Sequence, residues 1–172
     1  LQAMSTNMKI TPHFPSLLAL LFLCLILSTG YAQHGPHGGL PHSFHDSIPL
    51  YPEALGPFTW EVSTENSLAQ DYFNQGVQLK YAFAVNEAAR SFREACNLDP
   101  QCVACHWGEA WALAPYLNEP TSEAKAPLAL EADQSANKLV KKHGSELEKA
   151  LAAGIKSRYI KEYRPETRTL QE

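Results

Sequence analysis

The sequence predicts an all-α protein. Between Asn66 and Tyr159, apolar residues recur three and four positions apart over several stretches, which is the spacing of one helix face. Proline and glycine separate these stretches, and the strand-favouring residues valine and isoleucine are sparse. The 172 residues carry a net charge of −4 and are 45% hydrophobic. This composition excludes a wholly disordered chain and gives no basic surface that would indicate nucleic-acid binding.

The first 32 residues have the three parts of a secretory signal peptide. A short charged region at Met8-Lys9 precedes an apolar run from Ser16 to Leu27, and Gly30-Tyr31-Ala32 stands before the expected cut. The run is shorter than the ~20 residues that a membrane-spanning helix needs. We therefore expect residues 1–32 to be removed and the mature chain to be exported, either periplasmic or secreted, with no membrane span.

Residues 33–59 are predicted to form a disordered leader, because nine of these 27 positions are proline or glycine. The leader also contains four histidines, His34, His37, His42 and His45. A flexible histidine-rich tract can bind a transition-metal ion. The alternative is a polar linker without a metal, and the lack of cysteine ligands or a rigid scaffold in the segment favours that alternative.

Five helices are predicted after the leader. The first begins at the Asn66-Ser67 cap and ends at Tyr81, and the second runs from Glu87 to Leu98, ahead of Asp99-Pro100. The third begins just after Pro100 and ends at about Leu113. The fourth runs from near Pro127 to Gly144, and the fifth begins at a capping box at Ser145–Glu148. The fifth is expected to bury Leu147, Ala150, Leu151, Ile155 and Tyr159. We place the helical domain at residues 60–164 and a tail or truncation point at 165–172.

The first helical pair fits a 34-residue repeat. Counted through Ala69–Cys102, the repeat positions are Tyr72, Gly76, Leu79, Ala88, Phe92, Ala95 and Pro100. Together with Phe73-Asn-Gln-Gly76, Tyr81-Ala-Phe83 and His106-Trp-Gly108, they make residues 58–160 resemble exported bacterial tetratricopeptide repeat proteins. The resemblance implies helical hairpins stacked as a short α-solenoid, with small residues where helices cross closely. Gln75 stands where the repeat usually has leucine.

A second, degenerate repeat begins at Val103. About three repeats are needed for a stable stack. We therefore expect the chain to be a fragment of a longer solenoid.

The sequence indicates a binding protein rather than an enzyme. It has no nucleophile elbow, no phosphate-binding loop and no H-E-x-x-H motif. We expect an exported scaffold, without a cofactor, that binds a protein or peptide partner on its concave helix face. That face is expected to include Asn74, Gln78 and Lys80.

One motif supports a competing hypothesis. Cys102-Val-Ala-Cys105-His106 is the C-x-x-C-H signature of c-type haem attachment, in which two thioethers form and the histidine ligates iron. The alternative function is therefore a periplasmic electron carrier with haem c. A disulfide from Cys96 to Cys102 or to Cys105 is a further possibility in an oxidising compartment. A redox-active C-x-x-C pair is disfavoured because no βαβ pattern surrounds it.

Overall fold

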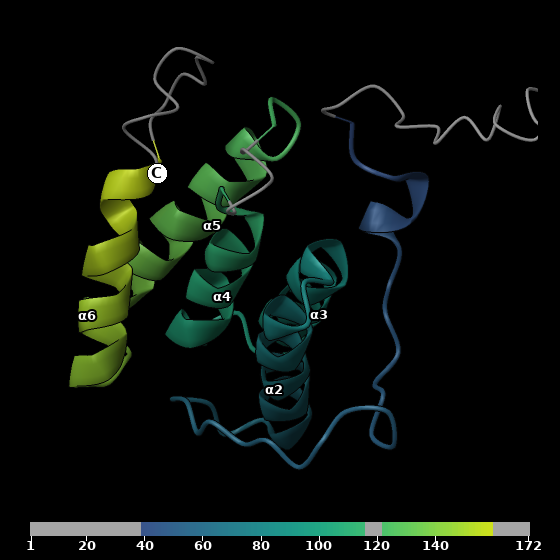
Figure 1. Ribbon diagram of the computed structural model, residues 1–172. Helices are drawn as coiled ribbons and strands as arrows, with labels where there is room; N and C mark the ends of the chain where they lie inside the picture. Colours follow the sequence, from purple (N-terminus) through teal and green to yellow (C-terminus); the bar gives the residue numbers. More distant parts are fainter. Residues whose placement is uncertain (1–38, 116–121, 160–172) are drawn as a thin grey trace, which may run out of the picture. The chain divides into compact units, whose positions relative to one another are not determined.

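The computed structural model describes residues 39–115 and 122–159 (Figure 1). In these ranges the regular structure consists of five α-helices and two short 3-10 helices, and no strand occurs. The α-helices are α2 (Ser67–Tyr81), α3 (Val85–Leu98), α4 (Val103–Leu113), α5 (Ala126–Leu139) and α6 (Glu146–Ile155), and the 3-10 helices are η1 (His42–His45) and η2 (Lys156–Arg158). The predicted all-α class is confirmed. The expected signal peptide and the 165–172 tail lie outside the described residues.

Side-chain caps begin the helices where the sequence predicts them. The Asn66 side chain accepts hydrogen bonds from the backbone N–H groups of Leu68 and Ala69 at the start of α2. The capping box of α6 is complete, because Ser145 and Glu148 each bond the other's backbone N–H. Two bounds differ from the prediction: α3 starts at Val85 rather than Glu87, and α5 ends at Leu139 rather than at Gly144.

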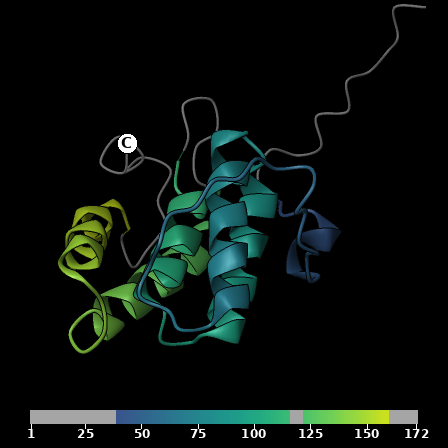
Figure 2. The ribbon, with the colours of Figure 1, turned by 90° about the horizontal axis from the view of Figure 1, so that it is seen from below.

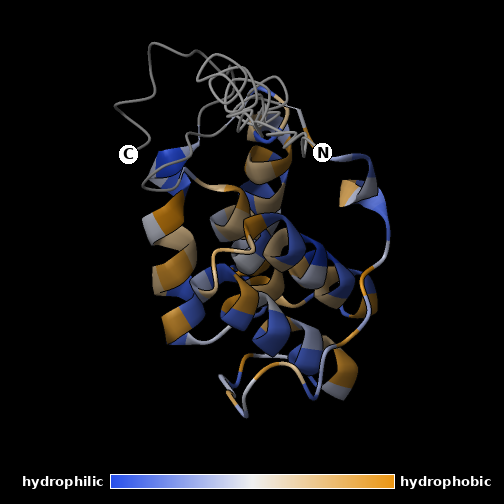
Figure 3. Ribbon diagram, turned by 45° about the vertical axis from the view of Figure 1, so that its right-hand side comes forward, coloured by the Kyte–Doolittle hydropathy of each residue, from blue (hydrophilic) through white to orange (hydrophobic). Residues whose placement is uncertain are grey.

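The helices pack in sequence order, with α2 against α3 and α4 against α2, α3, α5 and α6 (Figures 1 and 2). Orange apolar and blue polar segments alternate around the helices in Figure 3, as amphipathic packing requires. Both α2 and α4 approach α3 closely at the fully buried Phe92. A Cβ at Gly76 of α2 would lie 2.8 Å from the Phe92 ring, and one at Gly108 of α4 would lie closer still.

Residues 39–65, which we call the strap, correct the prediction of a disordered linker. Phe44 and Ile48 are buried in the core, and the strap passes along α2 and α3 (Figures 1 and 2). Arg93 of α3 donates to the Phe44 carbonyl at 3.0 Å, and its guanidinium carbon lies 4.5 Å from the Phe44 ring centroid. Proline and glycine prevent a long helix here, but they do not prevent an extended segment from packing against other helices.

The prediction for the buried face of α6 is wrong in part. Ile155 and Tyr159 are buried as expected and Leu151 is half-buried, but Leu147 is 53% exposed and Ala150 is exposed, while Glu148 and Ala152 are buried instead. The reason is the strap, which brings Ser63 to the Glu148 carboxylate and so gives this buried charge hydrogen-bond partners.

In the described residues, no helix is both long enough and apolar enough to cross a membrane.

The packing around Phe92 can be tested with Gly76→Ala. The added Cβ would collide with the buried ring, so we expect the free energy of unfolding in urea to fall by about 1–3 kcal/mol. Gly154→Ala is the matched control, because this α6 glycine has nothing within 4 Å of an added Cβ. The control is expected to gain up to about 1 kcal/mol from helix propensity. Equal effects of the two substitutions would contradict close packing at Gly76.

Candidate functional site

Three side chains of α2 hold the main chain of the strap, and we call Gln70, Asn74 and Gln75 the carboxamide clamp. Gln70 accepts a hydrogen bond from the Val62 N–H at 3.0 Å and donates one to the Trp60 carbonyl at 2.8 Å. Asn74 accepts from the Trp60 N–H at 3.0 Å.

Gln75 makes the same kind of contact further back along the strap. It accepts from the Tyr51 N–H at 2.7 Å and donates to the Pro49 carbonyl at 3.0 Å. All of these bonds go to backbone atoms, so the clamp recognises an extended main chain rather than particular side chains.

The clamp follows from the local sequence of α2. Residues four apart share a helix face, and Gln70 indeed donates to the Asn74 side chain at 3.1 Å. Gln75, where the repeat resemblance has leucine, is buried and also donates to Ser91 of α3 at 3.1 Å. Its amide satisfies polar groups of the strap that a leucine would leave unpaired.

An aromatic anchor fixes the strap beside the clamp. The Trp60 ring meets Phe73 of α2 at 5.6 Å and Trp107 of α4 at 5.9 Å between centroids, both edge to face. Such pairs add attraction beyond the buried area alone. Trp60 therefore joins the strap to two helices at once.

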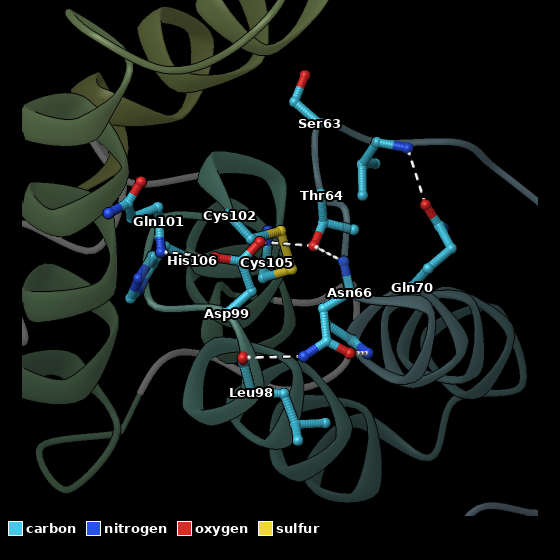
Figure 4. The surroundings of a disulfide bond; sticks show 12 residues. Ser63, Thr64, Asn66, Gln70, Leu98, Asp99, Gln101, Cys102, Cys105 and His106 are labelled. Carbon is cyan, nitrogen blue, oxygen red and sulfur yellow. Dashed lines mark hydrogen bonds between the residues drawn. A yellow bond between two sulfur atoms is a disulfide. The ribbon is translucent and has the colours of Figure 1, made fainter.

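The end of the strap is held by two carboxylates from other elements. The backbone N–H and hydroxyl of Ser63 donate to Glu148 of α6 at 3.1 and 2.6 Å. Thr64 donates its hydroxyl proton to Asp99 at 2.5 Å (Figure 4). Burial opposes the charge of Glu148, but the hydrogen bonds from Ser63 and Ser145 outweigh it and hold the pKa of Glu148 below its usual range.

The structure brings together two of the three residues predicted to bind a partner. Asn74, which belongs to the clamp, and Gln78 both line a cavity of about 290 Å³ between α2 and strap residues 50–59. Lys80 is buried elsewhere, with its ammonium 3.3 Å from the Ala112 carbonyl and 5.6 Å from the Trp111 ring centroid. The sequence reasoning missed Gln70 and Gln75, although the four-residue spacing of Gln70 and Asn74 was a usable signal.

The repeat positions lie mostly in the core. Gly76, Leu79, Ala88, Phe92 and Ala95 are buried, and Pro100 is exposed in the turn between α3 and α4. Tyr72 is half-buried and donates its hydroxyl proton to the Ile48 carbonyl of the strap at 2.9 Å.

The cysteine pairing differs from both of the disulfides that the sequence left open. Cys102 bonds to Cys105, and Cys96 is a buried free thiol, so neither of the two disulfides considered possible from Cys96 forms (Figure 4). Cys102 caps α4, with its sulfur accepting from the Cys105 N–H, and one helical turn therefore brings the two side chains together. Burial raises the pKa of the Cys96 thiol well above its ordinary value, and the carboxylate of Glu109 raises it further. A thiol held protonated in this way reacts poorly.

The C-x-x-C-H residues in this arrangement do not fit a covalent haem. Attachment needs both sulfurs for thioether bonds, but here they are bonded to each other and both cysteines are fully buried. The Nε2 atom of His106 lies 3.1 Å from the Pro100 carbonyl, a hydrogen bond in which the ring nitrogen donates. This bond engages the nitrogen that would otherwise bind iron.

The histidine tract is only partly described. His42 and His45 lie exposed in η1, whereas His34 and His37 lie outside the described residues. In residues 39–115 and 122–159, no group of three or more histidine, cysteine or acidic side chains is placed to hold a metal ion.

Comparisons with protein-family models, with curated proteins and with solved structures find no match for this chain. The tetratricopeptide resemblance therefore stays a prediction from the residues quoted above.

The contact between Glu148 and the strap predicts acid sensitivity. Because the folded-state pKa of Glu148 is lowered, its stabilisation is complete above the unfolded pKa of about 4.3 and is lost as pH falls through the folded pKa. Glu148→Gln should lower the free energy of unfolding at pH 7 by about 1–3 kcal/mol and flatten its decline below about pH 4.5. The free energy of unfolding in urea, measured from pH 3 to pH 7 in steps of about one pH unit, tests this expectation. Glu146→Gln, two residues earlier and exposed on α6, should leave the dependence of the free energy of unfolding on pH nearly unchanged.

The disulfide assignment predicts a specific peptide map. Alkylation of the native protein without reductant should leave Cys96 unmodified, and alkylation after unfolding should label Cys96 alone among the cysteines of α3 and α4. Mass spectrometry of the digest should then find Cys102 and Cys105 linked within one peptide. A peptide linking Cys96 to either of the other two would refute the assignment, and a haem adduct on Cys102 and Cys105 would restore the electron-carrier hypothesis.

Proposed function

We propose that the chain is an exported, non-enzymatic scaffold of the tetratricopeptide type that binds an extended segment of a protein partner. Two helical hairpins in succession, α2 with α3 and α4 with α5, support the proposed repeat. The order of contacts supports it too, because α4 touches α2 on one side and α6 on the other. Glycines at the crossing with Phe92 are the small residues that such close stacking needs.

The observation that carries the proposal is the carboxamide clamp. It holds Trp60 and Val62 of the strap by their backbone groups, with an aromatic ring seated between α2 and α4. This is the way an extended peptide is bound in general: main-chain hydrogen bonds contribute affinity, and a pocket for one large side chain contributes selectivity. The strap thus serves as an intramolecular analogue of the extended peptide that we propose the clamp binds.

Export and the absence of catalysis are parts of the same proposal. A disulfide between Cys102 and Cys105 is typical of an oxidising compartment, which agrees with the signal peptide read from residues 1–32. The buried or half-buried carboxylates Asp99, Glu109 and Glu148 are each engaged by Thr64, Arg93 and Ser63 respectively. Such structural engagement favours a binding protein over a general acid–base site.

A peptide carrying residues 57–65, labelled with a fluorophore, tests the proposed peptide binding. Trp60→Ala in the full chain weakens the strap's own hold on the clamp, so we expect this variant to bind the peptide saturably in an anisotropy titration. The wild-type chain should bind it at least about tenfold more weakly, because its tethered strap is present at a high effective concentration.

Two variants control this experiment. Gln70→Ala, added to Trp60→Ala, should reduce peptide binding about tenfold, whereas Gln134→Ala on the exposed side of α5 should not. The proposed function would be contradicted if the folded Trp60→Ala protein showed no saturable binding of the peptide. It would also be contradicted if Trp60→Ala bound the peptide equally well with and without the added Gln70→Ala.

A further inference from the structure

The strap ends on two carboxylates that lie outside the carboxamide clamp. Ser63 donates its backbone N–H and its hydroxyl proton to Glu148 of α6 at 3.1 and 2.6 Å. Thr64 donates its hydroxyl proton to Asp99, in the turn between α3 and α4, at 2.5 Å (Figure 4). These two residues follow Trp60, the aromatic anchor, by three and four positions. The strap therefore combines an aromatic ring with two hydroxyl donors at a fixed spacing.

Glu148 depends on the strap for half of its hydrogen bonds. It is only 2% exposed, and its carboxylate accepts four hydrogen bonds, two from Ser63 and two from Ser145. A buried charge that lacks hydrogen-bond partners is costly. A partner segment seated in place of the strap would exclude water from this carboxylate again. Such a segment must therefore supply the two missing donors itself.

Asp99 has one carboxylate oxygen that is satisfied only by the strap. Its Oδ1 atom accepts from the Gln101 N–H at 3.0 Å, and its Oδ2 atom accepts from Thr64. Asp99 also lines a cavity of about 990 Å³ beside Thr64, and in the described part of the chain no lysine or arginine is among the residues that line it. A hydroxyl donor at the Thr64 position is therefore favoured, whereas a carboxylate there would be repelled.

A tight turn of the strap brings both hydroxyls to their carboxylates. The Thr64 N–H donates to the Val62 carbonyl at 2.8 Å, which is the two-residue spacing of a γ-turn. Val62 is itself held by Gln70 of the clamp. A segment that replaces the strap needs a backbone N–H at the Ser63 and Thr64 positions. Proline is therefore excluded at both positions.

We propose that the clamp, Glu148 and Asp99 together select a partner segment in which an aromatic residue is followed, three and four positions later, by serine or threonine. The inference rests on the proposed function and specifies the partner's sequence. The clamp holds the main chain beside the aromatic residue, and the two carboxylates determine which side chains can follow. Apolar side chains there would leave the carboxylates without donors, and acidic ones would add like charge beside them.

The test uses the Trp60→Ala chain and the labelled 57–65 peptide, numbered as in the strap. In the peptide, Ser63→Ala and Thr64→Val should each weaken binding about tenfold, because each removes a hydrogen bond to a carboxylate. Ser63→Asp should weaken it about a hundredfold through repulsion between like charges. Thr59→Val in the peptide is the matched control, because it removes a threonine hydroxyl that is exposed in the strap. Its affinity should stay within about twofold of that of the unaltered peptide.

Substitutions in the chain show which carboxylate selects at which position. With Glu148→Gln added, the loss of affinity caused by Ser63→Ala in the peptide should shrink from about tenfold to about twofold, while the loss caused by Thr64→Val stays the same. Asp99→Asn should have the reverse effect. Glu146→Gln, exposed on α6, should leave both losses unchanged. Circular dichroism confirms that each variant is folded before the titration.

Two results would overturn the inference while leaving the proposed function intact. One is equal binding of the unaltered, Ser63→Ala and Thr64→Val peptides. The other is a pair of losses that neither Glu148→Gln nor Asp99→Asn changes. In both cases the unaltered peptide still binds, so only the selectivity is wrong. If the unaltered peptide shows no saturable binding to the Trp60→Ala chain, the proposed function fails and the inference fails with it.

Discussion

The position of Phe92 determines how the first three α-helices fit together. Its ring is fully buried, and it faces Gly76 of α2 and Gly108 of α4 at distances that leave no room for a Cβ. Both helices must approach α3 closely, since otherwise the ring would border a cavity whose cost rises with its volume. Phe73 of α2 lies 5.5 Å from the Phe92 ring and 5.6 Å from the Trp60 ring, so the position of Phe92 also limits where Trp60 can lie. The seat of the strap on α2 therefore depends in part on the packing around Phe92.

The strap is part of the fold because the helices alone bury few large side chains. The buried residues are dominated by alanine, including Ala69, Ala88, Ala89, Ala95, Ala104, Ala110, Ala129 and Ala136. Each contributes little apolar area, and the stabilisation from burial scales with that area. Phe44 and Ile48 add two large, fully buried side chains, and Arg93 binds the Phe44 backbone and ring together. The strap thus completes a core that would otherwise be thin.

The sequence predicted most of the helices because their signals are local. The Asn66 cap, the Ser145–Glu148 capping box and the proline and glycine breaks act within a few residues, and the structure confirms both caps. The strap and the clamp depend on partners far apart in the chain, such as Ser63 with Glu148, which periodicity does not encode. The cysteine pairing was missed although its signal is local. Cys102 and Cys105 lie within one helical turn, but the prediction disfavoured a redox-active C-x-x-C pair for lack of a βαβ pattern and considered disulfides from Cys96 instead.

A partner that binds the clamp must first displace part of the strap. It competes with Trp60 and with backbone hydrogen bonds that the chain already makes to itself. Displacing them exposes apolar surface, so only a segment with its own large aromatic residue recovers the lost contacts. The apparent affinity of such a segment is therefore reduced by the fraction of molecules in which the strap is open.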